Sequence, residues 1–128
     1  MATLPSQSTL VNIYNIVVTF DPTGPGSFTF SAPMPADKKL RIGQGINLIV
    51  FDLVTPGATW MPDPIAWLDG TTPPFNQPQR YNEKRFTLLV YNTVLEAVNN
   101  EHMFNMSVLY DGVVHTSDPT IINDPPTG

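Results

Sequence analysis

A chain of 128 residues with 41% hydrophobic residues has the size of one domain and can bury one ordinary core. Its formal net charge of −5 and six scattered basic residues exclude the dense positive surface that nucleic acid or anionic lipid would require. The absence of cysteine excludes disulfides, thiol catalysis and thiolate metal sites, and suits a reducing compartment.

Fourteen prolines and eight glycines, with only 13% charged residues, are typical of many short strands joined by turns. The first ten residues lack the basic and apolar parts of a secretory signal, and no stretch reaches the roughly 20 apolar residues of a membrane span. We therefore expect a single all-β domain over residues 1–128 in the cytoplasm, with no membrane or nucleic-acid partner.

Four segments in the first half of the chain have strand patterns. β-branched and aromatic residues fill 10–20, and the Pro/Gly cluster at 21–26 ends this strand. Residues 27–31 alternate polar and aromatic side chains, and residues 40–42 form a short apolar alternation. Residues 46–54 are the most apolar segment and should lie at the centre of a sheet.

The middle of the chain is dense in proline. Within residues 56–85 we expect one strand, around residues 65–68, and otherwise a long ordered loop or short edge pairing. Residues 85–92 alternate as a strand, and 93–102 is the only window compatible with a helical turn.

The strongest local pattern is a hairpin near the C-terminus. Residues 103–110 alternate, Asp111-Gly112 supplies a type I′ turn, and 113–116 return antiparallel. Because Pro119 has no N–H, the second arm should bend at a bulge or change partner there. Seven or eight short strands without crossover helices predict an antiparallel two-sheet sandwich of immunoglobulin-like type, with a jelly roll or small barrel as the alternative.

Half of the eight aspartates directly precede a proline, which favours turns over chemistry. A carboxylate in this position can accept a hydrogen bond from an N–H just past the proline. The rival interpretation, a calcium site of three aspartates, lacks the required D-x-D-x-[DN] loop and the six or more oxygens. We expect no metal, and expect Asp118→Ala to lower stability by about 1 kcal/mol. The predicted turn-forming residues are Asp21, Asp63, Asp111, Gly112, Asp118 and Asp124.

The sequence contains no recognisable catalytic constellation. The only histidines are His102 and His115, and His115 with Ser117 and Asp118 does not provide a nucleophile, an aimed base and an oxyanion site. Metal-ligand spacings such as H-E-x-x-H and nucleotide fingerprints are absent as well. We therefore expect no enzyme activity, no catalytic residues and no cofactor.

Aromatic residues gather among six prolines in residues 56–81, where flat, stiff surfaces could stack on sugars or on a proline-rich peptide. The competing interpretation places Trp67 in the core and Trp60 over the open end of the sandwich. The candidate ligand-binding residues are Trp60, Trp67, Phe75 and Tyr81.

Three strands are apolar on both faces, whereas a lone sandwich should show one polar face per strand. We expect the surplus apolar face to join copies of the chain into a homo-oligomer, unless residues 56–85 fold over it. The candidate interface residues are Val11, Ile13, Val17, Ile49, Phe51, Leu89 and Tyr91.

The segment FNMSVLYDG, followed by SDPTIINDPP, resembles a group of small uncharacterised bacterial proteins called the DP-EP family. The similarity covers about the last 25 residues, and Asp124-Pro125-Pro126 replaces the Glu-Pro ending of that family. The resemblance implies a bacterial or phage source and a compact β domain, and it implies no activity.

The patterns together favour a non-enzymatic structural or protein-interaction module that self-associates through an apolar sheet face. The alternative is a carbohydrate- or proline-rich-peptide-binding domain that uses the aromatic residues of 56–81.

Overall fold

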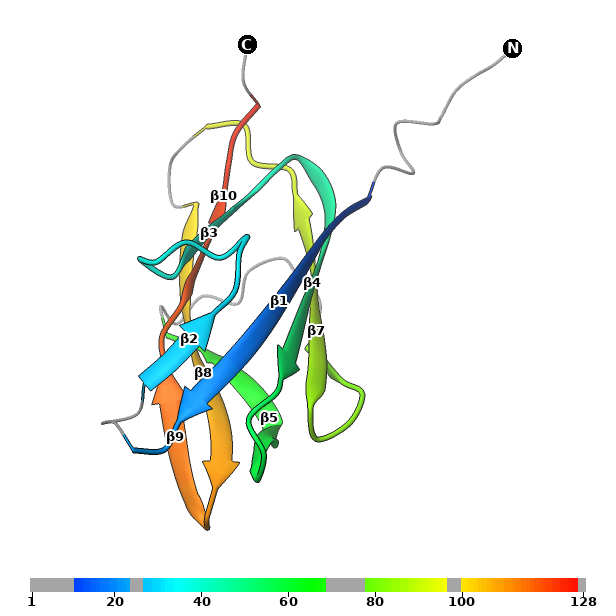
Figure 1. The fold of residues 1–128 in the computed structure, drawn as a ribbon. Coiled ribbons are helices and arrows are strands. Elements are labelled where there is room, and N and C mark those ends of the chain that lie inside the picture. The colour runs from blue at the N-terminus through cyan, green and yellow to red at the C-terminus, as the bar shows by residue number, and fades with distance from the viewer. Residues whose placement is uncertain (1–10, 24–26, 69–77, 97–99, 127–128) are drawn as a thin grey trace.

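The computed structural model describes residues 11–23, 27–68, 78–96 and 100–126, which form ten strands and no helix. The strands pack as two open sheets, which confirms the predicted all-β sandwich (Figure 1). None of the described residues belongs to a helix long and apolar enough to cross a membrane. The strands are β1 (Val11–Asp21), β2 (Ser27–Phe30), β3 (Lys39–Ile42), β4 (Gly45–Leu53), β5 (Ala58–Trp67), β6 (Gln79–Arg80), β7 (Arg85–Asn92), β8 (Glu101–Tyr110), β9 (Val113–Ser117) and β10 (Thr120–Asn123).

Both sheets are mixed, so the expectation of purely antiparallel pairing is wrong. Sheet A has the order β2-β1-β4-β7-β6, and sheet B has the order β3-β10-β8-β5, with β9 also paired to β8. β1 pairs with β4 in parallel, and β3 pairs with β10 in parallel. The first parallel pair arises because the chain leaves sheet A after β2, runs through β3 in sheet B, and re-enters sheet A at the end where β1 began (Figure 1).

The core lies between the two sheets and is built from alternate residues of each strand. Alternate side chains of β7 and of residues 103–110 in β8 point inward, as the sequence alternation predicted, and all of them but the partly buried Tyr110 at the end of the predicted β8 face are fully buried. Phe86 stacks on Phe51 with ring centroids 4.8 Å apart and meets the edge of Trp60 at 4.7 Å, which ties the sheets together. The inward core residues of these two strands are Phe86, Leu88, Val90, Phe104, Met106 and Val108.

The predicted C-terminal hairpin is confirmed. Asp111 has a φ of 51° and Gly112 a φ of 76°, the left-handed values that a type I′ turn requires. Beyond the turn, the second arm keeps its register on β8: Met106 pairs with Ser117 and Met103 with Thr120. The expected bulge at Pro119 is therefore absent, since the Pro119 carbonyl still accepts the Phe104 N–H at 3.1 Å. The arm also gains β3 as a second neighbour after the proline.

The bulge lies in β5 instead. Its pairing with β8 shifts between Trp60 and Ile65, where the chain reads Met61-Pro62-Asp63-Pro64. The two prolines lack the N–H groups that a regular ladder of hydrogen bonds needs. The strand therefore continues past them only because a bulge interrupts the ladder there. β5 is therefore longer than the strand expected at 65–68, and β6 is the short edge pairing expected in the same region.

Lys84, between β6 and β7, links the two sheets at one end of the sandwich. Its carbonyl accepts hydrogen bonds from the Leu53 N–H at 2.7 Å and from the Trp60 indole N–H at 3.0 Å. Its ammonium donates to the Thr55 carbonyl at 2.9 Å and also to the Ala58 carbonyl. These bonds fix the loop that carries Tyr81.

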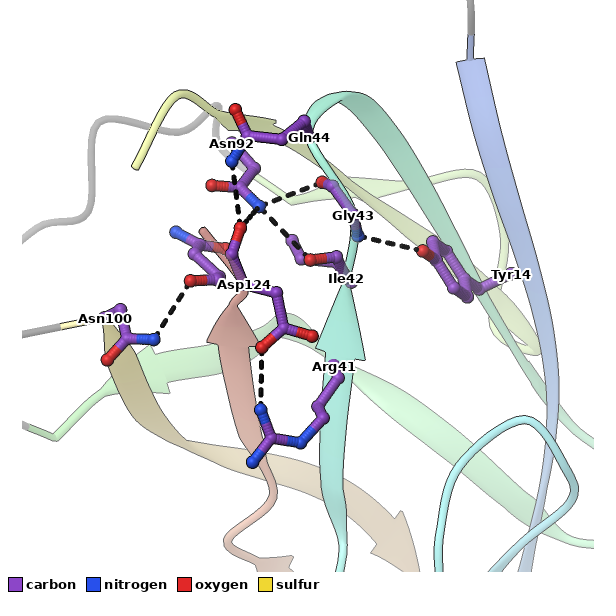
Figure 2. A network of polar contacts seen from close by, with 9 residues as sticks. Tyr14, Arg41, Ile42, Gly43, Gln44, Asn92, Asn100 and Asp124 are labelled. Carbon is purple, nitrogen blue, oxygen red and sulfur yellow. Dashed lines mark hydrogen bonds and ion pairs between the residues drawn. The ribbon is translucent and has the colours of Figure 1, made fainter. Parts of the chain in front are cut away.

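A polar network around Asn92 closes the opposite end (Figure 2). The buried Asn92 amide nitrogen donates to the carbonyls of Ile42, Gly43 and Asp124 at 3.1, 2.9 and 2.8 Å. The Asn100 amide similarly donates to the Asn123 carbonyl at 3.0 Å. The end of β7 is thereby joined to the β3–β4 turn and to the segment after β10.

Candidate functional site

The outer face of sheet A carries two rows of apolar side chains across its three central strands. Residues directly opposite in neighbouring strands point to the same side, so the rows form one continuous surface. Val11 is 46% exposed, Ile13 59% and Tyr91 41%. The described part of residues 56–85 thus leaves this surface open. The apolar rows consist of Val11, Ile46 and Tyr91, and of Ile13, Leu48 and Leu89.

Five of the seven predicted interface residues point to this outer face. They include Val17, which is 41% exposed and lies beside Asp52 of β4. The prediction is wrong for Ile49 and Phe51, which are fully buried between the sheets. The five are Val11, Ile13, Val17, Leu89 and Tyr91.

The error arises because β4 is apolar on both sides, so alternation alone does not say which side is outward. The outward residues of β4 are Ile46, Leu48, Val50 and Asp52. Asp52 was the available signal, since a charged residue marks the side that meets water. Asn47 points the other way, because its side chain is buried and bonded to the carbonyls of Gly43 and Gly45.

Asp52 and Arg85, the charged residues beside the apolar rows, neutralise each other. Arg85 Nε donates to Asp52 Oδ1 at 2.6 Å, and Arg85 Nη2 donates to Asp52 Oδ2 at 3.0 Å. The two residues thus form a bidentate pair across β4 and β7. The hydrogen bond to Asp52 and the attraction of its charge raise the pKa of the Arg85 guanidinium. The pair leaves the surroundings of the apolar rows without a net charge, and the remaining charge on these three strands, Asp21, lies at the far end of β1.

A hollow of about 340 Å³ continues from the apolar rows toward the β6–β7 loop. Tyr81 stands at this hollow with 64% of its surface exposed. Its backbone N–H donates to the Arg85 carbonyl at 3.0 Å, which fixes the ring beside the sheet. The hollow is lined by Leu48, Val50, Tyr81, Asn82, Arg85 and Thr87.

The predicted aromatic binding surface is not assembled in the described part of the chain. Trp60 is 1% exposed and belongs to the core, so its assignment as a ligand-binding residue is wrong. Trp67 packs edge-on against Phe104 at 5.2 Å on the inner side of β5. Tyr81 lies on the other sheet, and Phe75 falls outside the described residues.

The predicted turn residues behave differently from one another. Asp21 forms the expected turn, because its Oδ1 accepts the Thr23 N–H at 2.9 Å and the Thr23 hydroxyl at 2.7 Å. The hydrogen bond from the Thr23 hydroxyl has the larger effect, and the two bonds together lower the pKa of the Asp21 carboxyl below its ordinary 3.8. Asp111 and Gly112 form the hairpin turn as expected.

The other three Asp-Pro pairs depart from the prediction. Asp63 lies inside β5 at the bulge rather than at a strand end. Asp118 is exposed, and its carboxylate accepts no hydrogen bond from any described residue. Asp124 instead pairs with the Arg41 guanidinium at 2.6 Å (Figure 2).

Each of the two histidines lies beside an aromatic ring. The His115 ring packs at a tilt of 41° against Phe20 with centroids 4.5 Å apart, and Ser117 Oγ accepts a hydrogen bond from Lys38 Nζ at 3.1 Å. His102 meets the edge of Trp67 at 6.4 Å. No three His, Asp or Glu side chains of the described ranges gather as a metal site. Asp111 lies in the turn between β8 and β9, and Asp124 follows β10; that turn and the C-terminal end of β10 lie at opposite ends of the molecule (Figure 1).

No family model matches the chain, and no curated protein matches it. The geometry of the described residues is therefore what indicates a function. Its most distinctive feature is the exposed, charge-balanced apolar surface of sheet A.

Proposed function

We propose that this protein is a non-enzymatic structural or protein-interaction module that self-associates through the outer face of sheet A. The observation that carries the proposal is the pair of apolar rows, in which Ile13 is 59% exposed as part of a continuous surface. An apolar surface spanning three strands is costly to leave in water and is typical of an interface.

A second copy of the chain is the partner that the charges favour. The chain carries a net charge of −5, so most pairs of its surfaces would repel each other. On the outer face, Asp52 and Arg85 neutralise each other in a bidentate pair. Two such faces can therefore approach without electrostatic repulsion, and two-fold packing would place identical rows against each other.

The experiment is a solution-mass measurement by light scattering of the wild-type chain and of Ile13→Lys. We expect a wild-type mass of at least twice the 14.1 kDa of one chain at tens of micromolar. Ile13→Lys should shift the mass to that of a monomer, because burying a lysine ammonium against an apolar copy is unfavourable. Its exposed position leaves the core untouched.

Val114→Lys is the matched control, since Val114 is 50% exposed on β9 of the other sheet. It introduces the same charge on the same kind of strand and should leave the assembly intact. A wild-type chain that is strictly monomeric, or a control that dissociates as readily as Ile13→Lys, would overturn the proposal.

The second candidate function is binding of a carbohydrate or proline-rich peptide at the hollow beside Tyr81. A single exposed ring with Asn82 and Arg85 nearby offers one stacking surface and polar partners. Calorimetric titration with cello-oligosaccharides and with a polyproline peptide tests it. Tyr81→Ala should abolish the heat if the hollow binds either probe, and absence of heat in the wild type excludes both.

An immunoglobulin-like assignment, a bacterial source and a cytoplasmic location complete the proposal. Two packed five-stranded sheets with chain crossings between them support the first. The similarity of the C-terminal hairpin and Asp-Pro tail to the DP-EP family supports the second. The lack of cysteine supports the third.

A further inference from the structure

A cavity of about 280 Å³ opens beside the edge strand β2, away from the apolar rows of sheet A. Its volume lies just below the usual range for ligand pockets, which suits a compact ligand. Phe28 and Phe30 form an aromatic wall, with ring centroids 6.5 Å apart and planes inclined by 16°. The lining residues are Phe28, Thr29, Phe30, Pro35, Ala36 and Lys38.

Lys38 is held firmly at this cavity by its backbone. It has a φ of 62°, in the left-handed region that a lysine seldom adopts. Its N–H donates to the Pro35 carbonyl at 3.0 Å, and its carbonyl accepts the Thr120 N–H at 2.9 Å. Both bonds would have to break for the residue to leave this conformation, so the backbone of Lys38 stays beside the cavity.

The charge of Lys38 is not neutralised by any described carboxylate. Its half-buried ammonium donates to the neutral Ser117 hydroxyl at 3.1 Å. An ammonium has three N–H donors, so two remain available to a ligand. The neighbouring Lys39, in contrast, faces Glu101 at 3.9 Å and is exposed.

We propose that this cavity binds a small monocarboxylic acid that carries a flat apolar group. The carboxylate accepts hydrogen bonds from Lys38 Nζ, and the apolar group lies against Phe28, Phe30 and Pro35. A carboxylate is the natural complement of an ammonium without an acidic partner, and the aromatic wall favours an apolar ring over a hydrated one. This binding is independent of the self-association proposed for sheet A.

The test is an NMR titration of the full chain with benzoate, and with benzamide as the neutral analogue of the same shape. We expect benzoate to shift the amide signals of residues 28–30 and 38 saturably. Benzamide should bind about tenfold more weakly or worse, because it lacks the charge that strengthens the bond to Lys38. Equal affinity for the two probes, or no saturable shift with benzoate, would contradict the proposal.

Two lysine variants complete the test. Lys38→Met keeps the unbranched, apolar part of the side chain and removes its charge, and should weaken benzoate binding about tenfold or more. Lys39→Met removes the same charge one residue away and should leave the affinity unchanged. An equal loss in both variants would show a general charge effect and refute the site. Should Lys38→Met not fold, the comparison of benzoate with benzamide on the wild-type chain still decides the question.

Discussion

The hydroxyl of Thr55 satisfies both backbone polar groups of Phe20: it accepts the Phe20 N–H at 2.7 Å and donates to the Phe20 carbonyl at 3.1 Å. The parallel pairing of β1 with β4 ends at Val18 and Leu53, two residues before Phe20. The Thr55 side chain therefore takes the place of the next strand residue in a buried position.

Replacing Thr55 with valine should lower the free energy of unfolding by about 2 kcal/mol, because two buried backbone groups lose their partner while the volume is kept. Urea denaturation measures this loss. The control is Thr19→Val, since Thr19 is exposed on the outer side of β1, and its effect should stay within about 0.5 kcal/mol. Equal effects of the two changes would show that the Thr55 hydroxyl contributes nothing specific.

Asn92→Asp should destabilise the opposite end of the sandwich by about 3 kcal/mol at neutral pH. The amide nitrogen that donates to three carbonyls becomes a carboxylate oxygen that repels them. Unfolding measured at mildly acidic pH should show a smaller loss, because a protonated carboxyl can donate one hydrogen bond. Asn15→Asp adds the same charge at an exposed position of β1 and should be nearly neutral at both pH values. A loss independent of pH would argue against this account.

The turn at Asp21 should give a measurable pH dependence. Its carboxyl pKa is lowered in the folded chain mainly by the hydrogen bond from the Thr23 hydroxyl and to a smaller extent by the one from the Thr23 N–H. The stabilisation is therefore fully present above the ordinary value of 3.8 and is lost as the pH falls through the lower folded value. NMR titration of the carboxyl should show the lowered pKa in the wild type and in Thr23→Ser, and a higher one in Thr23→Val. An unchanged pKa in Thr23→Val would refute the assigned cause.

Asp111 and Asp118 should respond very differently to alanine. Asp111 has a φ of 51°, which aspartate tolerates better than alanine, so Asp111→Ala should cost about 1 kcal/mol. The Asp118 carboxylate accepts no hydrogen bond within the described ranges, so Asp118→Ala should change stability by less than about 0.5 kcal/mol. This replaces the larger loss expected from the Asp-Pro pattern. Thermal unfolding of the two variants side by side decides between them.

The positions of the strands could be predicted because the signals for them are local. Alternation placed β7 and β8 correctly, and Asp111-Gly112 placed the turn, since a type I′ turn depends on two adjacent residues. Pairing direction is not local. The parallel neighbours β1 and β4 depend on the path of the chain through the other sheet, for which no pair of residues carries a signal.

The candidate site was predictable to the same degree. The surplus of apolar residues on β1 and β7 indicated an outer surface, and five of the seven predicted residues share it. Ile49 and Phe51 were misassigned because β4 is apolar on both sides and because Asn47, a polar residue, points inward to bond carbonyls. Lys38 had no local signal, since its partners at Ser117 and Thr120 are distant in sequence.

The parallel pairing of β3 with β10 joins residues 39–42 to residues 120–123 across most of the chain. Sheet B therefore reaches its full width only when β10 has docked on β3. Closing the long chain segment between these two strands lowers the conformational entropy before their pairing can stabilise the sheet. A ribosome-bound chain truncated before β10 would leave β3 without the neighbour that covers its hydrogen-bonding edge. Completion of sheet B thus requires β10, and a product that lacks this strand should be prone to aggregate.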